Sequence, residues 1–143
     1  MYSLQELAIK KINSKGIIIG DNVPEEIREY IMYSRKVSEI DEINNLFELR
    51  KKVKKLLEEK NHIRYDVLIC KYLELMNCGK KFKAMVLIDE MLQYAFVNKN
   101  ANMIEKILKK CPEINKTIEL LCVKKKYDEE FCKYVIYLYE NEK

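Results

Sequence analysis

Apolar residues recur at every third or fourth position along most of this chain, and the recurrence is clearest between residues 65 and 92. This spacing is the period of an amphipathic helix that packs against its neighbours. Two such runs flank Asn77-Cys78-Gly79, where Gly79 suits the left-handed residue that ends many helices. Residues 65–92 are therefore predicted to form a helical hairpin around which the fold is organised. Its apolar positions are Val67, Leu68, Cys70, Tyr72, Leu75, Phe82, Met85, Val86, Leu87, Met91 and Leu92.

The N-terminal part of the chain, residues 3–34, is predicted to form a helix–loop–helix unit. Ser3 and Glu6 have the spacing of a capping box, which satisfies the free N–H groups at a helix start. Pro24 suits the first turn of the second helix, and the apolar pattern of that helix fades by Ser34.

The longest single helix is predicted to begin at Ser38 and to run to about Lys60. Serine is a favoured residue at a helix start, because its hydroxyl accepts a hydrogen bond from a free N–H group. The apolar side of this helix would comprise Ile40, Ile43, Leu46, Phe47, Val53, Leu56 and Leu57.

The rest of the helical-hairpin body, which spans residues 38–143, continues this pattern. Pro112 is expected to end one helix and to begin the next, and Asp128 is expected to cap the last one. Because the connections are short, neighbouring helices are expected to be antiparallel. The prediction is a single all-α domain, residues 1–143, with about eight helices arranged as antiparallel helical hairpins.

Composition supports this fold class and restricts the kind of partner. Of the 143 residues, 48% are hydrophobic and 35% are charged, and only three are Gly and two are Pro, which favours helices over a β-sandwich. The formal net charge of +4 permits nucleic acid or another anionic surface as partner. The sequence shows no signal-peptide pattern and no apolar run of ~20 residues, so we expect a cytoplasmic protein without a membrane partner. Five cysteines without a C-x-x-C pair predict buried, reduced thiols.

The sequence gives little indication of catalytic activity. The one histidine, His62, lies in a polar stretch beside Asn61 and Arg64, which is typical of a surface residue. Phosphate-binding glycine loops, zinc-protease motifs and nucleophile elbows are absent. The scattered thiols lack the close pairing of structural zinc ligands. We therefore predict a protein that is not an enzyme and that uses no cofactor, metal or small-molecule substrate.

Basic residues recur in groups at predicted helix ends and on polar helix faces. Lysine and arginine side chains there suit contacts with phosphate groups, which supply affinity without reading a base sequence. Tyr127, Tyr134, Tyr137 and Tyr139 could stack on exposed bases. The predicted nucleic-acid contacts are Arg50, Lys51, Lys54, Lys55, Lys80, Lys81, Lys83, Lys109, Lys110, Lys124, Lys125 and Lys126.

Part of the central hairpin resembles a pentatricopeptide-type repeat. The run Gly79-Lys80-Lys81-Phe82-Lys83-Ala84, followed by Asp89-Glu90-Met91, is similar to the second helix of such a repeat. Tyr65 with Leu68-Ile69 resembles the start of its first helix, which would be longer here. The resemblance implies a helical hairpin. Only one copy is visible, so the base-reading residues of that family are not carried over, and the hairpin is interpreted as a scaffold.

The N-terminal segment resembles the elongin-binding box of SOCS-box proteins. The resemblance rests on Ser3-Leu4-Gln5-Glu6-Leu7-Ala8 with Ile12. The downstream cullin-side segment is similar to Val23-Pro24 with Ile27 and Tyr30-Ile31. Ala8 replaces the usual Cys, and a second Leu-Pro is missing. The resemblance implies an adaptor that recruits elongin and a cullin ubiquitin ligase through residues 3–31. The residues that would bind are Leu4, Leu7, Ala8, Ile12 and Pro24.

In size and composition the chain also resembles the small dormancy factors of microsporidian ribosomes. High Lys, Ile, Asn and Tyr usage suggests an AT-rich genome, which fits that likeness. The favoured prediction is a regulatory, translation-silencing factor that contacts ribosomal RNA and ribosomal proteins. The elongin and cullin adaptor is the alternative.

Overall fold

The computed structural model describes residues 24–59, 64–124 and 126–141, and every regular element within these ranges is helical. The all-α class is therefore confirmed. The described residues contain seven α-helices rather than about eight, and the predicted helix at the N-terminus lies outside them. The α-helices are α2 (Glu25–Ser38), α3 (Leu46–Leu57), α4 (Arg64–Asn77), α5 (Lys81–Val97), α6 (Ala101–Lys110), α7 (Asn115–Val123) and α8 (Glu129–Asn141), and the 3-10 helices are η1 (Glu39–Glu42) and η2 (Pro112–Ile114).

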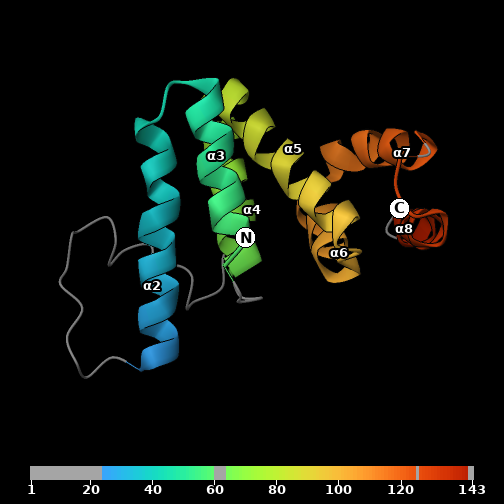
Figure 1. Ribbon diagram of the computed structural model, residues 1–143, viewed down its shortest axis with the longest axis horizontal. Helices are drawn as coiled ribbons and strands as arrows, with labels where there is room; N and C mark the ends of the chain where they lie inside the picture. Colours follow the sequence, from blue (N-terminus) through green and yellow to red (C-terminus); the bar gives the residue numbers. More distant parts are fainter. Residues whose placement is uncertain (1–23, 60–63, 125, 142–143) are drawn as a thin grey trace.

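The helices form a row that begins with α2 and ends with α7 and α8 (Figure 1). Helix α4 packs against α2, α5 and α6, whereas α5 packs against α3, α4 and α6. At the far end, α8 packs against α6 and α7. Most packing therefore joins each helix to its nearest or next-nearest neighbour in the chain. The segment predicted as the organising element supplies α4 and most of α5, which hold the centre of the row.

A continuous hydrophobic core runs through the row from Tyr33 on α2 to Val135 on α8. Leu68 of α4 and Leu87 of α5 are fully buried, and burial of one such side chain contributes roughly 1.5–3 kcal/mol. The Tyr33 hydroxyl donates a 2.9 Å hydrogen bond to the carbonyl oxygen of Leu56, which ties α2 to α3.

The turn between α4 and α5 has the conformation predicted at Gly79. Its φ is +77°, the Gly79 N–H donates to the Met76 carbonyl at 3.2 Å, and the Lys80 N–H donates to the Leu75 carbonyl at 2.9 Å. This pair of bonds is the Schellman motif, which satisfies carbonyls at a helix end. The same pair of bonds closes α5, where Lys99, with φ +52°, takes the left-handed position.

The prediction of one long helix from Ser38 to Lys60 is wrong. Helix α2 continues past Ser34 to Ser38 and runs directly into η1. Ile43 then adopts an extended backbone, with φ −95° and ψ +121°. Asn45 caps α3 instead of Ser38, because its side-chain oxygen accepts a 3.1 Å hydrogen bond from the Glu48 N–H. An asparagine that can bond the backbone two to three residues ahead competes with continued helix at this point.

Some positions assigned to apolar stripes are on the surface. Phe47 is 71% exposed and Phe82 is 60% exposed, and Leu46 and Met85 are also exposed. On α3 the face centred on Leu49 is the one that meets the core. These four exposed apolar residues therefore lie in the first turn of α3 and the first two turns of α5.

Candidate functional site

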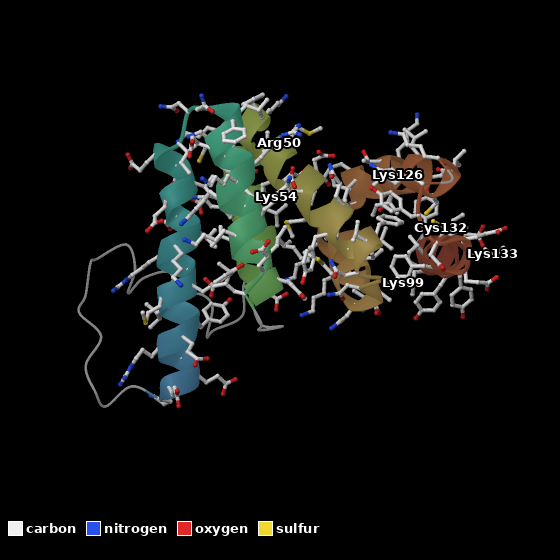
Figure 2. The ribbon with its side chains drawn as sticks, viewed as in Figure 1. Arg50, Lys54, Lys99, Lys126, Cys132 and Lys133 are labelled. Atoms are coloured by element: carbon white, nitrogen blue, oxygen red, sulfur yellow. The ribbon has the colours of Figure 1, made fainter. Side chains whose placement is uncertain are left out.

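Helix α3 carries a group of four cations on its solvent side, which we call the α3 basic face: Arg50, Lys51, Lys54 and Lys55. All four are exposed, because the opposite side of α3 packs Leu49 and Val53 into the core. Figure 2 shows Arg50 and Lys54 on α3. Within the described part of the chain, none of the four makes an ion pair or a side-chain hydrogen bond.

Two carboxylates close to α3 are paired with lysines outside the α3 basic face. Lys52 pairs with Glu39 of η1, and this bond is the main cause that lowers the pKa of Glu39. Lys36 of α2 pairs with Glu59 at 3.0 Å. These lysines and glutamates therefore compensate one another's charge between α2 and α3. The cations on the outer side of α3 stay unpaired among the described residues.

The three predicted lysines at the α4–α5 turn have different roles. Lys83 is half-buried and donates to the backbone carbonyls of Ile40 and Asp41, at 3.3 and 2.7 Å. It therefore caps the end of η1 and is not available to a ligand. Lys80 and Lys81 are exposed and make no ion pair with any described residue.

The predicted lysines of α6 are held by carboxylates. Lys109 pairs with Glu105 at 3.2 Å, on the same helix. Lys110 approaches Asp66 of α4 at 3.7 Å, and Lys106 approaches the same carboxylate at 3.5 Å. The positive charge of α6 is therefore largely compensated inside the molecule.

After α7 the chain presents Lys124 and Lys126, both exposed, whereas Lys125 lies outside the described residues. The Lys126 amine lies 5.7 Å from the ring centroid of Tyr127, and that ring packs on Phe96 at 5.0 Å. Figure 2 shows Lys126 near α7, far along the row from Arg50.

The predicted base-stacking tyrosines divide into two groups. On α8, Tyr134 and Tyr137 are exposed, with stacked rings 6.3 Å apart. Tyr127 and Tyr139 pack against the core, and burial is the main cause that raises the pKa of Tyr127. Only the α8 pair is therefore available to a flat ligand.

Of the residues predicted to bind elongin, Leu4, Leu7, Ala8 and Ile12 lie outside the described residues. Pro24 is exposed just before α2. In the downstream segment, Ile31 is buried in the molecule.

Sequence reasoning missed one lysine with a structural role. Lys71 on α4 is only 5% exposed, and its amine pairs with Asp41 at 2.7 Å and with Glu74 at 3.5 Å. A lysine on an otherwise apolar helix face was the available signal. Its pairing with η1 explains how a cation is tolerated in the core, because a buried charge without partners would be costly.

The cysteines are free thiols, and the prediction that they are buried holds for Cys111 and Cys132 but is wrong for Cys78. Burial is the main cause that raises the pKa of Cys111 to about 12. Burial also raises the pKa of Cys122 to about 12, with a second contribution from the neighbouring Cys132. Among the residues that the structure describes, no group of three His, Cys, Asp or Glu side chains could hold a metal ion.

A groove lies where η1 and the start of α3 meet the α4–α5 turn. Its volume is about 400 Å³. We call it the lysine-rimmed groove, and its lining residues are Asp41, Ile43, Asn44, Leu49, Gly79, Lys80, Lys81, Phe82 and Lys83. No such concavity was predicted, because its walls come from segments far apart in the sequence.

Comparison with known proteins adds no further constraint: no protein family, no curated protein and no solved structure matches this chain. In the described ranges no helix is both long and apolar enough to cross a membrane.

Proposed function

We propose that this protein is a non-enzymatic binding protein that docks on a ribosome or another RNA–protein assembly in the cytoplasm. The α3 basic face is the element that contacts phosphate groups. The single observation that carries this proposal is that Arg50, Lys51, Lys54 and Lys55 stay exposed and unpaired among the described residues. Cations without internal partners can meet phosphates without first breaking an ion pair.

Phosphate contacts of this kind release counterions and supply affinity without reading a sequence. Arg50 can also form a bidentate contact with a phosphate, which a lysine cannot. Lys124 and Lys126 are a second, smaller contact farther along the row. The exposed Tyr134–Tyr137 pair would stack on an unpaired base near that end.

We further propose that the helices are stacked as antiparallel hairpins, which gives the assembly an extended surface to bind. The grooves support this arrangement. The lysine-rimmed groove is lined by Leu49 of α3 and Lys81 of α5. A second groove, of about 400 Å³, is lined by Lys54 of α3 and Gln93 of α5, among other residues. Helices α3 and α5 therefore run in the same direction, as alternate helices do in a stacked array.

A regulatory role as a translation-silencing or dormancy factor is the narrower form of this proposal. Its support is the resemblance in size and composition to the small dormancy factors of microsporidian ribosomes. The adaptor alternative would instead use residues 3–31, and the structure describes only the last part of that segment.

Co-sedimentation tests the proposal. A eukaryotic cell lysate that contains the full chain is sedimented at low salt, and mass spectrometry identifies what co-migrates with the chain. We expect sedimentation with ribosomes that is lost as the salt concentration rises. Absence of sedimentation at low salt would overturn the proposal, and recovery of elongin and a cullin instead would favour the adaptor.

A Leu4→Asp variant separates the two functions. Under the ribosome proposal the variant sediments like the parent chain, provided that its circular dichroism spectrum shows intact helices. Under the adaptor interpretation the variant no longer co-purifies with elongin.

A further inference from the structure

The lysine-rimmed groove is lined on one side by aliphatic residues that belong to the core. Ile43 packs partly against the core, and Leu49 is buried in it. On the opposite side, Phe82 stands 60% exposed. A groove of about 400 Å³ falls in the size range of ligand sites in proteins.

Exposed apolar side chains continue beyond the groove on both helices. Leu46 and Phe47 occupy the first turn of α3, and Phe47 is 71% exposed. Met85, one turn beyond Phe82 on α5, is 54% exposed. Apolar groups gathered in this way around a concavity mark a surface that a partner covers.

The charges of the groove leave a net positive rim. Its only lining carboxylate, Asp41, is paired with Lys71 at 2.7 Å, and Lys83 is bound to backbone carbonyls. Lys80 and Lys81 remain exposed without a described partner. The first turn of α5 contains no acidic residue and no side-chain cap, so nothing on α5 offsets the positive end of the helix dipole.

We propose that the lysine-rimmed groove binds an acidic peptide segment of a protein partner. An aliphatic or aromatic side chain of the peptide would lie against Ile43, Leu49 and Phe82, and its carboxylates would meet Lys80 and Lys81. The aliphatic wall favours a peptide over RNA, because nucleotides gain less from packing against branched side chains than from stacking on aromatic ones. This site is separate from the α3 basic face and does not depend on the phosphate-binding proposal.

Selection from a display library of short random peptides on the immobilised full chain tests this assignment. We expect enriched peptides in which Asp or Glu residues flank a large apolar residue. Peptides without an acidic bias would overturn the proposal, as would the absence of any enrichment. The strongest peptide is then synthesised with a fluorophore, and its affinity is measured by fluorescence anisotropy.

Matched variants locate the binding site. Phe82→Ser should lower the affinity for the peptide about tenfold. Lys80→Glu with Lys81→Glu should lower that affinity by at least as much. Val97→Ser is the control, because Val97 is an apolar residue on the same helix that is slightly more exposed than Phe82, at 68%, but lies outside the groove. Equal loss in Val97→Ser, or no loss in Phe82→Ser, would contradict the assignment.

Two further measurements separate this site from the phosphate-binding face. Arg50→Glu with Lys54→Glu should leave the affinity for the peptide within about twofold of the parent value, since neither residue lines the groove. A short oligouridine is the RNA probe. If Phe82→Ser lowered the affinity for the oligouridine and left the affinity for the peptide unchanged, the groove would be an RNA site and the proposal would be wrong.

Discussion

Helices α3 and α6 are both lysine-rich and amphipathic in sequence, but they differ in the pairing of their charges. The lysines of α6 are paired with carboxylates, whereas four cations of α3 are not, within the part of the chain that the structure describes. On α6, Lys106 and Lys110 share the carboxylate of Asp66, and Lys109 pairs with Glu105. On α3, Arg50 and Lys54 meet no carboxylate among the described residues. The comparison shows that pairing of a cation cluster depends on the carboxylates that neighbouring helices bring close to it, and the unpaired cluster on α3 is the one that we propose as a phosphate-contacting surface.

The position of each helix in the row explains the difference. Helix α6 packs against α4, so the last turn of α6 meets Asp66 in the first turn of α4. Helix α3 packs against α5 and η1 through the side that carries Leu49 and Val53. Its outer side faces solvent, and there no carboxylate of the described residues forms an ion pair with Arg50, Lys51, Lys54 or Lys55.

Charge reversal on α3, set against the same reversal at paired lysines of α6 and α8, is the largest test of this comparison. Arg50→Glu with Lys54→Glu should weaken binding to protein-free ribosomal RNA by about 100-fold at low salt, because two attractive contacts become repulsive. Lys109→Glu with Lys133→Glu makes the same change in net charge at lysines that are already paired. This control should lose less than about threefold. Equal losses in a filter-binding assay would show that only net charge matters.

Lys71 represents the extreme case of a paired lysine, and its role is structural. Lys71→Ala should lower the free energy of unfolding by about 2 kcal/mol, since it removes a partly buried charged hydrogen bond and leaves Asp41 without its partner. Urea denaturation followed by circular dichroism measures the change. A loss below about 0.5 kcal/mol would mean that the pair with Asp41 contributes little.

Removal of the acidic partner on α4 should make α6 resemble α3. Asp66→Asn frees Lys106 and Lys110, so RNA binding should rise about twofold to fivefold. The same change should cost roughly 0.5–1 kcal/mol of stability, because the pairs are partly exposed. Glu113→Gln is the control, since it removes one negative charge without freeing either lysine. Unchanged RNA binding in Asp66→Asn would indicate that α6 lies away from the RNA.

The smallest expected effect concerns Asp128, which caps α8 and pairs with Lys99 at 3.3 Å. The Phe131 N–H bond, followed by the Lys99 contact, lowers the pKa of Asp128 in the folded protein. A carboxyl group with a lowered pKa stabilises the fold above its unfolded pKa, and this contribution is lost as the pH falls through the folded pKa. Asp128→Asn should therefore lower Tm slightly near neutral pH. In acid, Tm of the variant should equal that of the parent chain. A Tm difference that grew toward acid would contradict this sign.

Local signals in the sequence located much of the fold. Gly79 and Asp128 act as predicted because turn and cap chemistry depends on residues within a few positions of each other. The four inward positions of α6 were equally predictable from their spacing, and all are buried: Met103, Ile104, Ile107 and Leu108. Ser38 failed as a cap because tertiary packing of α2 extends that helix by one turn beyond its apolar pattern.

Which cations stay unpaired was harder to predict, because pairing depends on residues far away in the chain. Lys83 and Lys81 look alike in sequence, yet Lys83 is occupied by the carbonyl of Asp41, which lies 42 residues earlier. Whether Phe82 faces the core or a groove depends on which neighbouring helix covers it. Spacing alone yields an apolar face without showing how much of that face another helix covers.

Salt dependence of RNA binding by the α3 basic face tests the central claim most directly. The logarithm of the binding constant for protein-free ribosomal RNA is measured against the logarithm of the salt concentration. For the parent chain we predict a slope of about −4, from six phosphate contacts, four on the α3 basic face and two at Lys124 and Lys126. Arg50→Ala with Lys54→Ala should reduce the magnitude of the slope by about 1.5, while Lys109→Ala with Lys110→Ala should leave it unchanged. The same slope in the parent chain and in the α3 variant would contradict the account.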